Sequence, residues 1–151
     1  MDTDTDLQTR PRRVRASPWP VIAAVSTGGA AGALARYGIS VAWPHRPDGF
    51  PWSTWAINVS GCLLIGVLMI LNAELWTGRR LVRPFLGVGV LGGYTTFSTS
   101  IVDVQQAAAH GAPGVAACYL GATVVGAMLA VWIGATATVW AVNARRARRE
   151  R

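Results

Sequence analysis

Four apolar stretches, each long enough to cross a bilayer as a helix, occupy most of this chain. A membrane-crossing helix needs roughly 20 mainly apolar residues, and the stretches that meet this need are residues 19–43, 54–75, 84–109 and 115–143. Charged residues make up only 14% of the chain, whereas a soluble domain carries about 25%. Tryptophans lie near the ends of the stretches, as interfacial side chains do. The sequence therefore predicts an all-α integral membrane protein with four transmembrane helices.

The segments that connect these stretches are short, so we expect one membrane domain over residues 19–143. Residues 1–18 alternate Asp and Thr and then turn to Arg and Pro, which predicts a disordered basic N-terminal tail because nothing apolar can be buried. Residues 144–151 are predicted to form a basic C-terminal tail. No connection could hold a soluble catalytic domain, so we expect the function to lie within the membrane.

All fourteen basic residues are arginines, and they are distributed unevenly around the apolar stretches. With four spans, both tails and the second connection share one face, and twelve arginines flank that face. The opposite face has only Arg46 outside the spans. The positive-inside rule then predicts a multi-pass cell-membrane protein with both termini in the cytoplasm. Because the basic residues flank apolar runs instead of forming a face, we expect the membrane surface as their partner and no nucleic acid.

Polar groups inside the stretches are informative, because an unpaired polar group in hydrocarbon costs several kcal/mol. Arg36 lies in the first stretch, Asn58 about one turn into the second, and Asp103 in the third. Arg36 can extend its side chain to the interface, and Asp103 can lie near an aqueous vestibule. For Asn58, a bond between helices and a place in a pore are equally good interpretations.

The third stretch contains a segment of poor helix sequence. Gly92 and Gly93 are followed by Thr95 and Thr96, and each glycine in a helix costs about 1 kcal/mol relative to alanine. A helix break near the membrane midplane is tolerated only where the backbone is buried in protein or lines a cavity. Freed carbonyls would suit an alkali cation. A kink whose carbonyls are bonded again by hydroxyl groups is an equally good interpretation.

Three segments, in this order, resemble the Fluc (CrcB) family of small membrane fluoride channels. They are residues 28–37 (GGAAGALARY), 58–66 (NVSGCLLIG) and 92–99 (GGYTTFST). The resemblance implies a fluoride-specific ion channel subunit, not an enzyme, that exports cytoplasmic fluoride passively and confers fluoride resistance. It also implies an antiparallel dimer of two four-helix subunits, each with its third helix broken near the midplane.

The resemblance assigns roles to individual residues. A structural Na+ ion, which is not transported, would be held at the dimer centre by the backbone carbonyls of Gly92 and Thr95. Asn58 matches the pore-lining asparagine of the family, and Phe97 matches a phenylalanine whose positive ring edge faces fluoride. The other residues that the resemblance singles out are Ser98, Thr99, Tyr119 and Thr123 on the fluoride pathway, and the charged residues Arg36 and Asp103.

One position departs from the family pattern. The second family phenylalanine follows the first by three residues, and Ser100 stands there in this chain. Whether one or two pores conduct is therefore open. Because the arginine bias of twelve against one predicts a single orientation, we expect pairing with an inverted paralogous subunit. A dual-topology homodimer is the alternative.

Two other classes of function compete with a fluoride channel. A small four-span cation or drug exporter usually relies on a membrane-embedded carboxylate in its first helix, whereas the first stretch offers Arg36 and no acid. A membrane scaffold or sensor that transports nothing would leave Asn58 and the 92–99 segment without a role.

Overall fold

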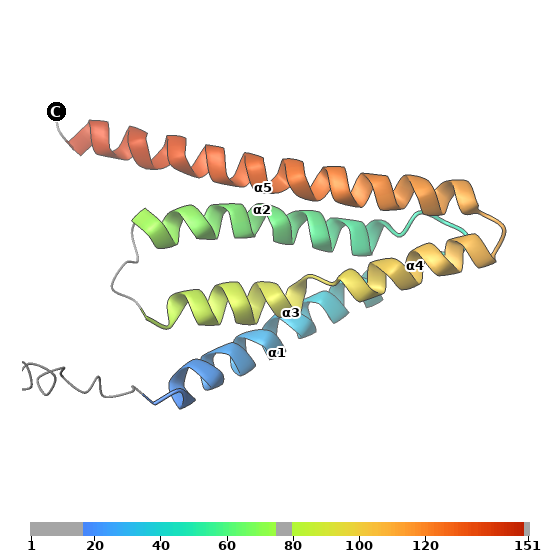
Figure 1. Cartoon of the computed structure of the whole chain (residues 1–151), viewed down its shortest axis with the longest axis horizontal. Coiled ribbons are helices and arrows are strands. Elements are labelled where there is room, and N and C mark those ends of the chain that lie inside the picture. Colours follow the sequence, from blue (N-terminus) through green and yellow to red (C-terminus); the bar gives the residue numbers. More distant parts are fainter. Residues whose placement is uncertain (1–16, 75–79, 150–151) are drawn as a thin grey trace, which may run out of the picture.

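The computed structural model describes residues 17–74 and 80–149, and these residues form helices and their connections, with no strand among them. The helices are α1 (Trp19–Ala42), α2 (Trp52–Glu74), η1 (Arg83–Leu91), α3 (Gly92–Tyr94), α4 (Phe97–Ala109) and α5 (Pro113–Arg149). They form an elongated bundle in which α5 runs beside α2, and α1 runs obliquely beneath α3 (Figure 1). The disorder predicted for the N-terminal tail falls on residues 1–16, outside the described residues.

Within the described residues, three helices are long and apolar enough to cross a membrane. They are Trp52–Glu74, the combined segment Arg83–Ala109, and Pro113–Arg149. The chain is therefore a multi-pass membrane protein. Helix α1 has 24 residues, which is long enough to span a bilayer, but Ser, Thr, Gly and Arg36 make it less apolar than the other three. Its assignment as a fourth span stays a prediction.

The bundle is held together by direct contact between helix backbones. At Gly32 on α1, an added Cβ would overlap the carbonyl of Val90 on η1. At Gly66 on α2, an added Cβ would overlap the carbonyl of Val131 on α5. Helix association in membranes depends on small residues that permit such an approach, which explains why the apolar stretches are rich in glycine and alanine.

Helix α5 continues through Arg149, so residues 144–149, which the sequence analysis assigns to a C-terminal tail, are helical. Alanine and arginine are good helix formers, and cations are favourable in the last turn of a helix. With 37 residues and a rise of about 1.5 Å per residue, α5 is about 55 Å long. That length exceeds the roughly 30 Å hydrocarbon core of a bilayer, so α5 projects beyond it.

Candidate functional site

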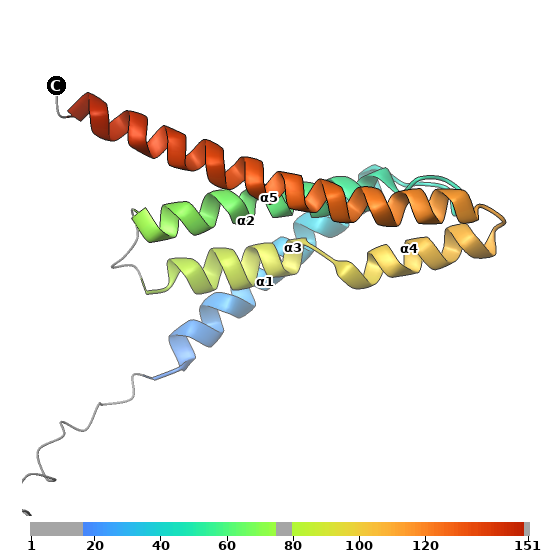
Figure 2. The ribbon, with the colours of Figure 1, turned by 45° about the horizontal axis from the view of Figure 1, so that its top comes forward.

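The backbone is interrupted between α3 and α4, as Figure 2 shows. Helix α3 ends at Tyr94, and α4 begins at Phe97. Between them, Thr95 (φ −79°, ψ 154°) and Thr96 (φ −149°, ψ 121°) have extended backbone conformations. Thr96 caps the new helix, because its Oγ1 accepts a hydrogen bond from the backbone N–H of Thr99 at 3.2 Å. The two threonines therefore separate the helical segments on either side.

Asn58 of α2 bonds directly to this interruption. Its side chain is only 8% exposed. Its Oδ1 accepts a hydrogen bond from the backbone N–H of Thr96 at 2.8 Å, and its Nδ2 donates to the carbonyl of Thr96 at 2.9 Å and to Ser100 Oγ at 2.8 Å. Asn58 thus joins two helices, and both of its amide hydrogens are engaged. A role in a pore stays a prediction.

The same hydrogen bonds free two backbone carbonyls. In a continuous helix the carbonyl of Gly92 would accept from Thr96, and that of Thr95 from Thr99. Here the N–H of Thr96 donates to Asn58, and that of Thr99 donates to the Thr96 hydroxyl. An added Cβ at Gly92 would meet nothing within 4 Å, so the space beside it is open. Both carbonyls therefore lack the donor that a continuous helix would give them, and carbonyl oxygens are ligands that suit an alkali cation.

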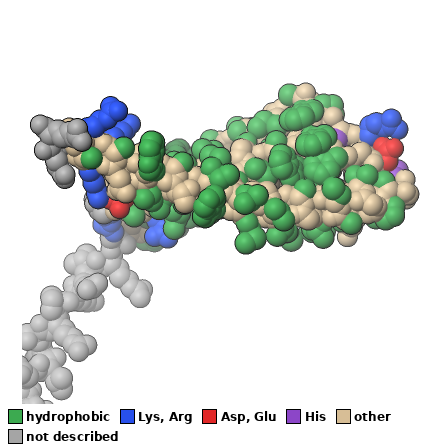
Figure 3. Space-filling view, turned by 90° about the horizontal axis from the view of Figure 1, so that it is seen from above, with side chains coloured by type: hydrophobic (Ala, Val, Ile, Leu, Met, Phe, Trp, Pro, Cys, Tyr) green, Lys and Arg blue, Asp and Glu red, His purple; other side chains and the backbone are tan. Residues whose placement is uncertain are grey.

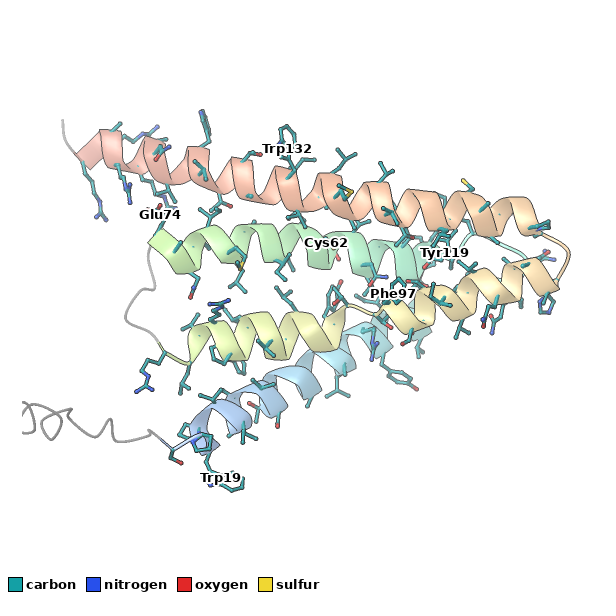
Figure 4. All side chains as sticks on the ribbon, in the orientation of Figure 1. Trp19, Cys62, Glu74, Phe97, Tyr119 and Trp132 are labelled. Atoms are coloured by element: carbon teal, nitrogen blue, oxygen red, sulfur yellow. The ribbon has the colours of Figure 1, made fainter. Side chains whose placement is uncertain are left out.

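A cavity of about 310 Å³ lies beside the interruption. Five residues that the sequence analysis singles out line it: Asn58, Gly92, Thr95, Phe97 and Thr123. Ser100, the position that departs from the family pattern, also lines it. Phe97 is 77% exposed and lies at the start of α4 beside the interruption (Figure 4). The cavity therefore collects residues from α2, the interrupted helix and α5.

Three other predicted pathway residues do not line this cavity. The hydroxyls of Ser98 and Thr99 lie 3.3 Å and 3.0 Å from Thr96 Oγ1, and both residues are exposed. Tyr119 is only 1% exposed, and its ring packs in a T-shaped arrangement with the ring of Phe50, with centroids 5.3 Å apart. Its hydroxyl and that of Thr123, one turn along α5, have no hydrogen-bond partner among the described residues. Thr123 thus brings one of these hydroxyls to the cavity, and Tyr119 lies one turn away from it on α5.

The two charged residues predicted within the spans lie apart from the cavity lining. Asp103 on α4 is buried, and its Oδ1 lies 3.5 Å from Nε2 of His45 in the α1–α2 connection. Its Oδ2 has no partner among the described residues. Arg36 is half-buried on α1. His45 cannot be identified from the sequence, because nothing in the local pattern indicates a partner 58 residues away in the chain.

An all-helical multi-pass membrane protein, with a cavity at an interrupted helix, is the class that this fold and site define. The profile of the family described as CrcB-like protein, Camphor Resistance (CrcB), matches residues 23–135. The chain belongs to this family, which confirms the resemblance found in the sequence.

Similar proteins carry a more specific name. A protein of Nocardia farcinica named Fluoride-specific ion channel FluC 2 is 46% identical over 136 residues, covering 90% of this chain and 97% of that protein. Proteins with the same name from Thermobifida fusca and Streptomyces avermitilis are 52% and 50% identical over 123 and 113 residues. Those matches cover 80% and 72% of this chain, and 91% and 72% of the respective relatives.

Proposed function

We propose that the chain is a subunit of a fluoride-specific channel that lets fluoride leave the cytoplasm passively. The similar proteins are named as ion channels, and the chain is a channel protein, not an enzyme. The observation that carries the proposal is the cavity at the interrupted helix, where Asn58, Phe97 and Thr123 meet. No acidic residue lies on α1, which disfavours the alternative of a small cation or drug exporter that depends on a carboxylate there.

The chemistry of the cavity suits a small, strongly hydrated anion, which gives up its water only to good hydrogen-bond donors. The Thr123 hydroxyl at the cavity and the Tyr119 hydroxyl one turn away on α5 have no hydrogen-bond partner among the described residues, so both can donate. The edge of an aromatic ring is its positive part, so the ring of Phe97 offers a further contact. Asn58 contributes when fluoride takes the place of the Ser100 hydroxyl at its Nδ2. Ser98 and Thr99 then belong to the same path at the start of α4.

We assign the carbonyls of Gly92 and Thr95 to a structural, non-transported Na+ ion. Support comes from the loss of both helical donors and from the open space beside Gly92. A cation bound between these oxygens would offset their partial negative charge. Two carbonyls are too few to complete a coordination shell, and in an antiparallel dimer the second subunit would contribute equivalent ligands.

The quaternary structure in this proposal is an antiparallel dimer of four-span subunits, with α1 as the first span and the third span broken near the midplane. The exposed ring of Phe97 at the cavity is a surface that a second subunit would cover. The arginine bias supports a cytoplasmic position for both termini of this chain and favours an inverted paralogous partner. The names of the three relatives carry the number 2, which is consistent with more than one such protein in each organism. A dual-topology homodimer is the alternative.

Fluoride efflux from liposomes tests the proposal. The complex is purified from the native membrane with whatever subunit accompanies this chain, and fluoride release is recorded with chloride-loaded liposomes as the control. We expect fluoride to leave and chloride to stay. Asn58→Asp, which places a negative charge at the cavity, should slow fluoride efflux strongly while assembly is retained.

The matched control is Asn72→Asp, because Asn72 is also on α2 and does not line the cavity. If fluoride stays inside the liposomes containing the unaltered complex, the proposed function is wrong. If Asn58→Asp conducts as fast as Asn72→Asp, the assigned path is wrong.

A further inference from the structure

A second hollow of the molecule lies between the last turns of α2 and α5. This groove has a volume of about 600 Å³. Leu71 of α2 and Val142 of α5 form part of its apolar wall, and its basic lining is made by three arginines, Arg145, Arg146 and Arg149. A surface that combines apolar walls with several cations is suited to an amphipathic anion.

The helix spacing explains why basic and apolar side chains meet in the groove. Val142, Arg145 and Arg149 are three and four residues apart, so they lie on one face of α5. That face is directed toward α2, because Val142 is buried. Arg146 forms an ion pair with Glu74 at the end of α2. Glu74 is the acidic residue among those lining the groove, so three arginines face one carboxylate and an excess of positive charge remains.

The position along α5 places the groove at the level of lipid headgroups. Trp140, whose side chain is 77% exposed, precedes the arginines by little more than one turn, and tryptophans of spanning helices are enriched at the membrane interface. Figure 3 shows Arg side chains gathered at this end of the molecule, while apolar side chains spread over much of the rest. The arginines therefore lie just outside the hydrocarbon, and the apolar wall reaches into it.

We propose that this groove binds an anionic phospholipid. The headgroup phosphate lies between Arg145 and Arg149, and the beginning of an acyl chain covers Leu71 and Val142. Guanidinium groups bind phosphate through two parallel hydrogen bonds, and basic pockets between membrane helices hold anionic headgroups. The negative end of the helix dipole favours a cation on any side of the last turn. The helix dipole does not account for an apolar wall below the arginines. A phospholipid requires both the arginines, for its phosphate, and the apolar wall, for its acyl chain.

Lipid binding to the purified complex tests the proposal. Native mass spectrometry measures retention of phosphatidylglycerol relative to phosphatidylcholine, for the unaltered chain and for single variants. We expect a preference for phosphatidylglycerol that falls about fivefold in Arg145→Gln and about fivefold in Arg149→Gln, the effect of one arginine near an anionic surface. Arg146 is left unchanged, because its replacement would also leave Glu74 without its partner.

The matched control is Arg148→Gln, which removes the same charge from the same turn of α5 at a residue that does not line the groove. Its preference should stay within twofold of the unaltered chain. Equal losses in Arg145→Gln and Arg148→Gln would mean diffuse attraction and overturn the site. Displacement of phosphatidylglycerol by an equal concentration of inorganic phosphate would also overturn it, because the groove would then be an anion site without lipid contact. Melting temperatures of all variants in phosphatidylcholine are measured alongside, and unchanged values show that lipid loss is not unfolding.

Discussion

Replacing Asn58 with leucine removes the three hydrogen bonds that join α2 to the interrupted helix. The carbonyl of Thr96 keeps one donor, because Ser100 Oγ also bonds to it at 3.1 Å. The N–H of Thr96 loses its partner inside the protein, which costs about 1–3 kcal/mol. The other two bonds are worth about 0.6 kcal/mol each in a membrane. The free energy of unfolding should therefore fall by about 2–4 kcal/mol.

Two measurements check this prediction: equilibrium unfolding in mixed detergent micelles, and hydrogen exchange at the backbone N–H of Thr96. Asn58→Leu should lower the unfolding midpoint and accelerate exchange at Thr96. Asn72→Leu is the matched control, since Asn72 is a half-buried asparagine on the same helix, and it should change neither. If Asn58→Leu unfolds at the midpoint of the unaltered chain and Thr96 exchanges at its original rate, Asn58 does not hold the interruption in place.

Three further predictions concern packing, the cation and orientation. Gly32→Val should lower the melting temperature, since overpacking costs about 1–3 kcal/mol. Gly38→Val should not, because an added Cβ there meets nothing within 4 Å. Equal melting temperatures of the two variants would contradict the backbone contact at Gly32. Exchange of sodium for N-methylglucamine should lower both the melting temperature and fluoride efflux if Gly92 and Thr95 hold Na+, and unchanged values would count against that site. Labelling of the C-terminus in cells that express this chain alone should find it almost wholly in the cytoplasm; comparable amounts on both faces would restore a dual-topology homodimer.

The features that the sequence predicts well are local ones. Length and hydropathy locate the spans now seen as α2, the combined segment 83–109, and α5, because a bilayer imposes both properties on any helix that crosses it. Helix propensity alone predicts a weak helix at the glycines and threonines of residues 92–99, and the extended residues Thr95 and Thr96 lie among them. For α1 the same reasoning is weaker, since small polar residues dilute its hydropathy.

The features that the sequence does not reveal depend on contacts between distant segments. Asn58 admitted two interpretations, and only the fold shows that its amide is bonded to Thr96, 38 residues further along. The hydroxyls of Ser98 and Thr99 lie near Thr96 Oγ1, the cap of α4. The first turn of a helix needs such hydrogen-bonding partners, and this use competes with a place on the fluoride pathway. The charge of Arg145 and its neighbours is typical of an unstructured tail, yet arginine also favours a helix. The groove with α2 exists because α5 continues as a helix through these arginines.

The central claim, passive and selective passage of fluoride, is tested most directly by controlling charge balance in liposomes loaded with potassium fluoride. In a passive channel, efflux of the anion builds up a voltage that stops further flow until another ion compensates. We predict that fluoride leaves when valinomycin lets potassium follow, that a protonophore added to the valinomycin-treated liposomes does not change the rate, and that chloride stays inside under the same conditions. Fluoride efflux that requires a proton gradient, or chloride efflux at the same rate as fluoride, would contradict the account.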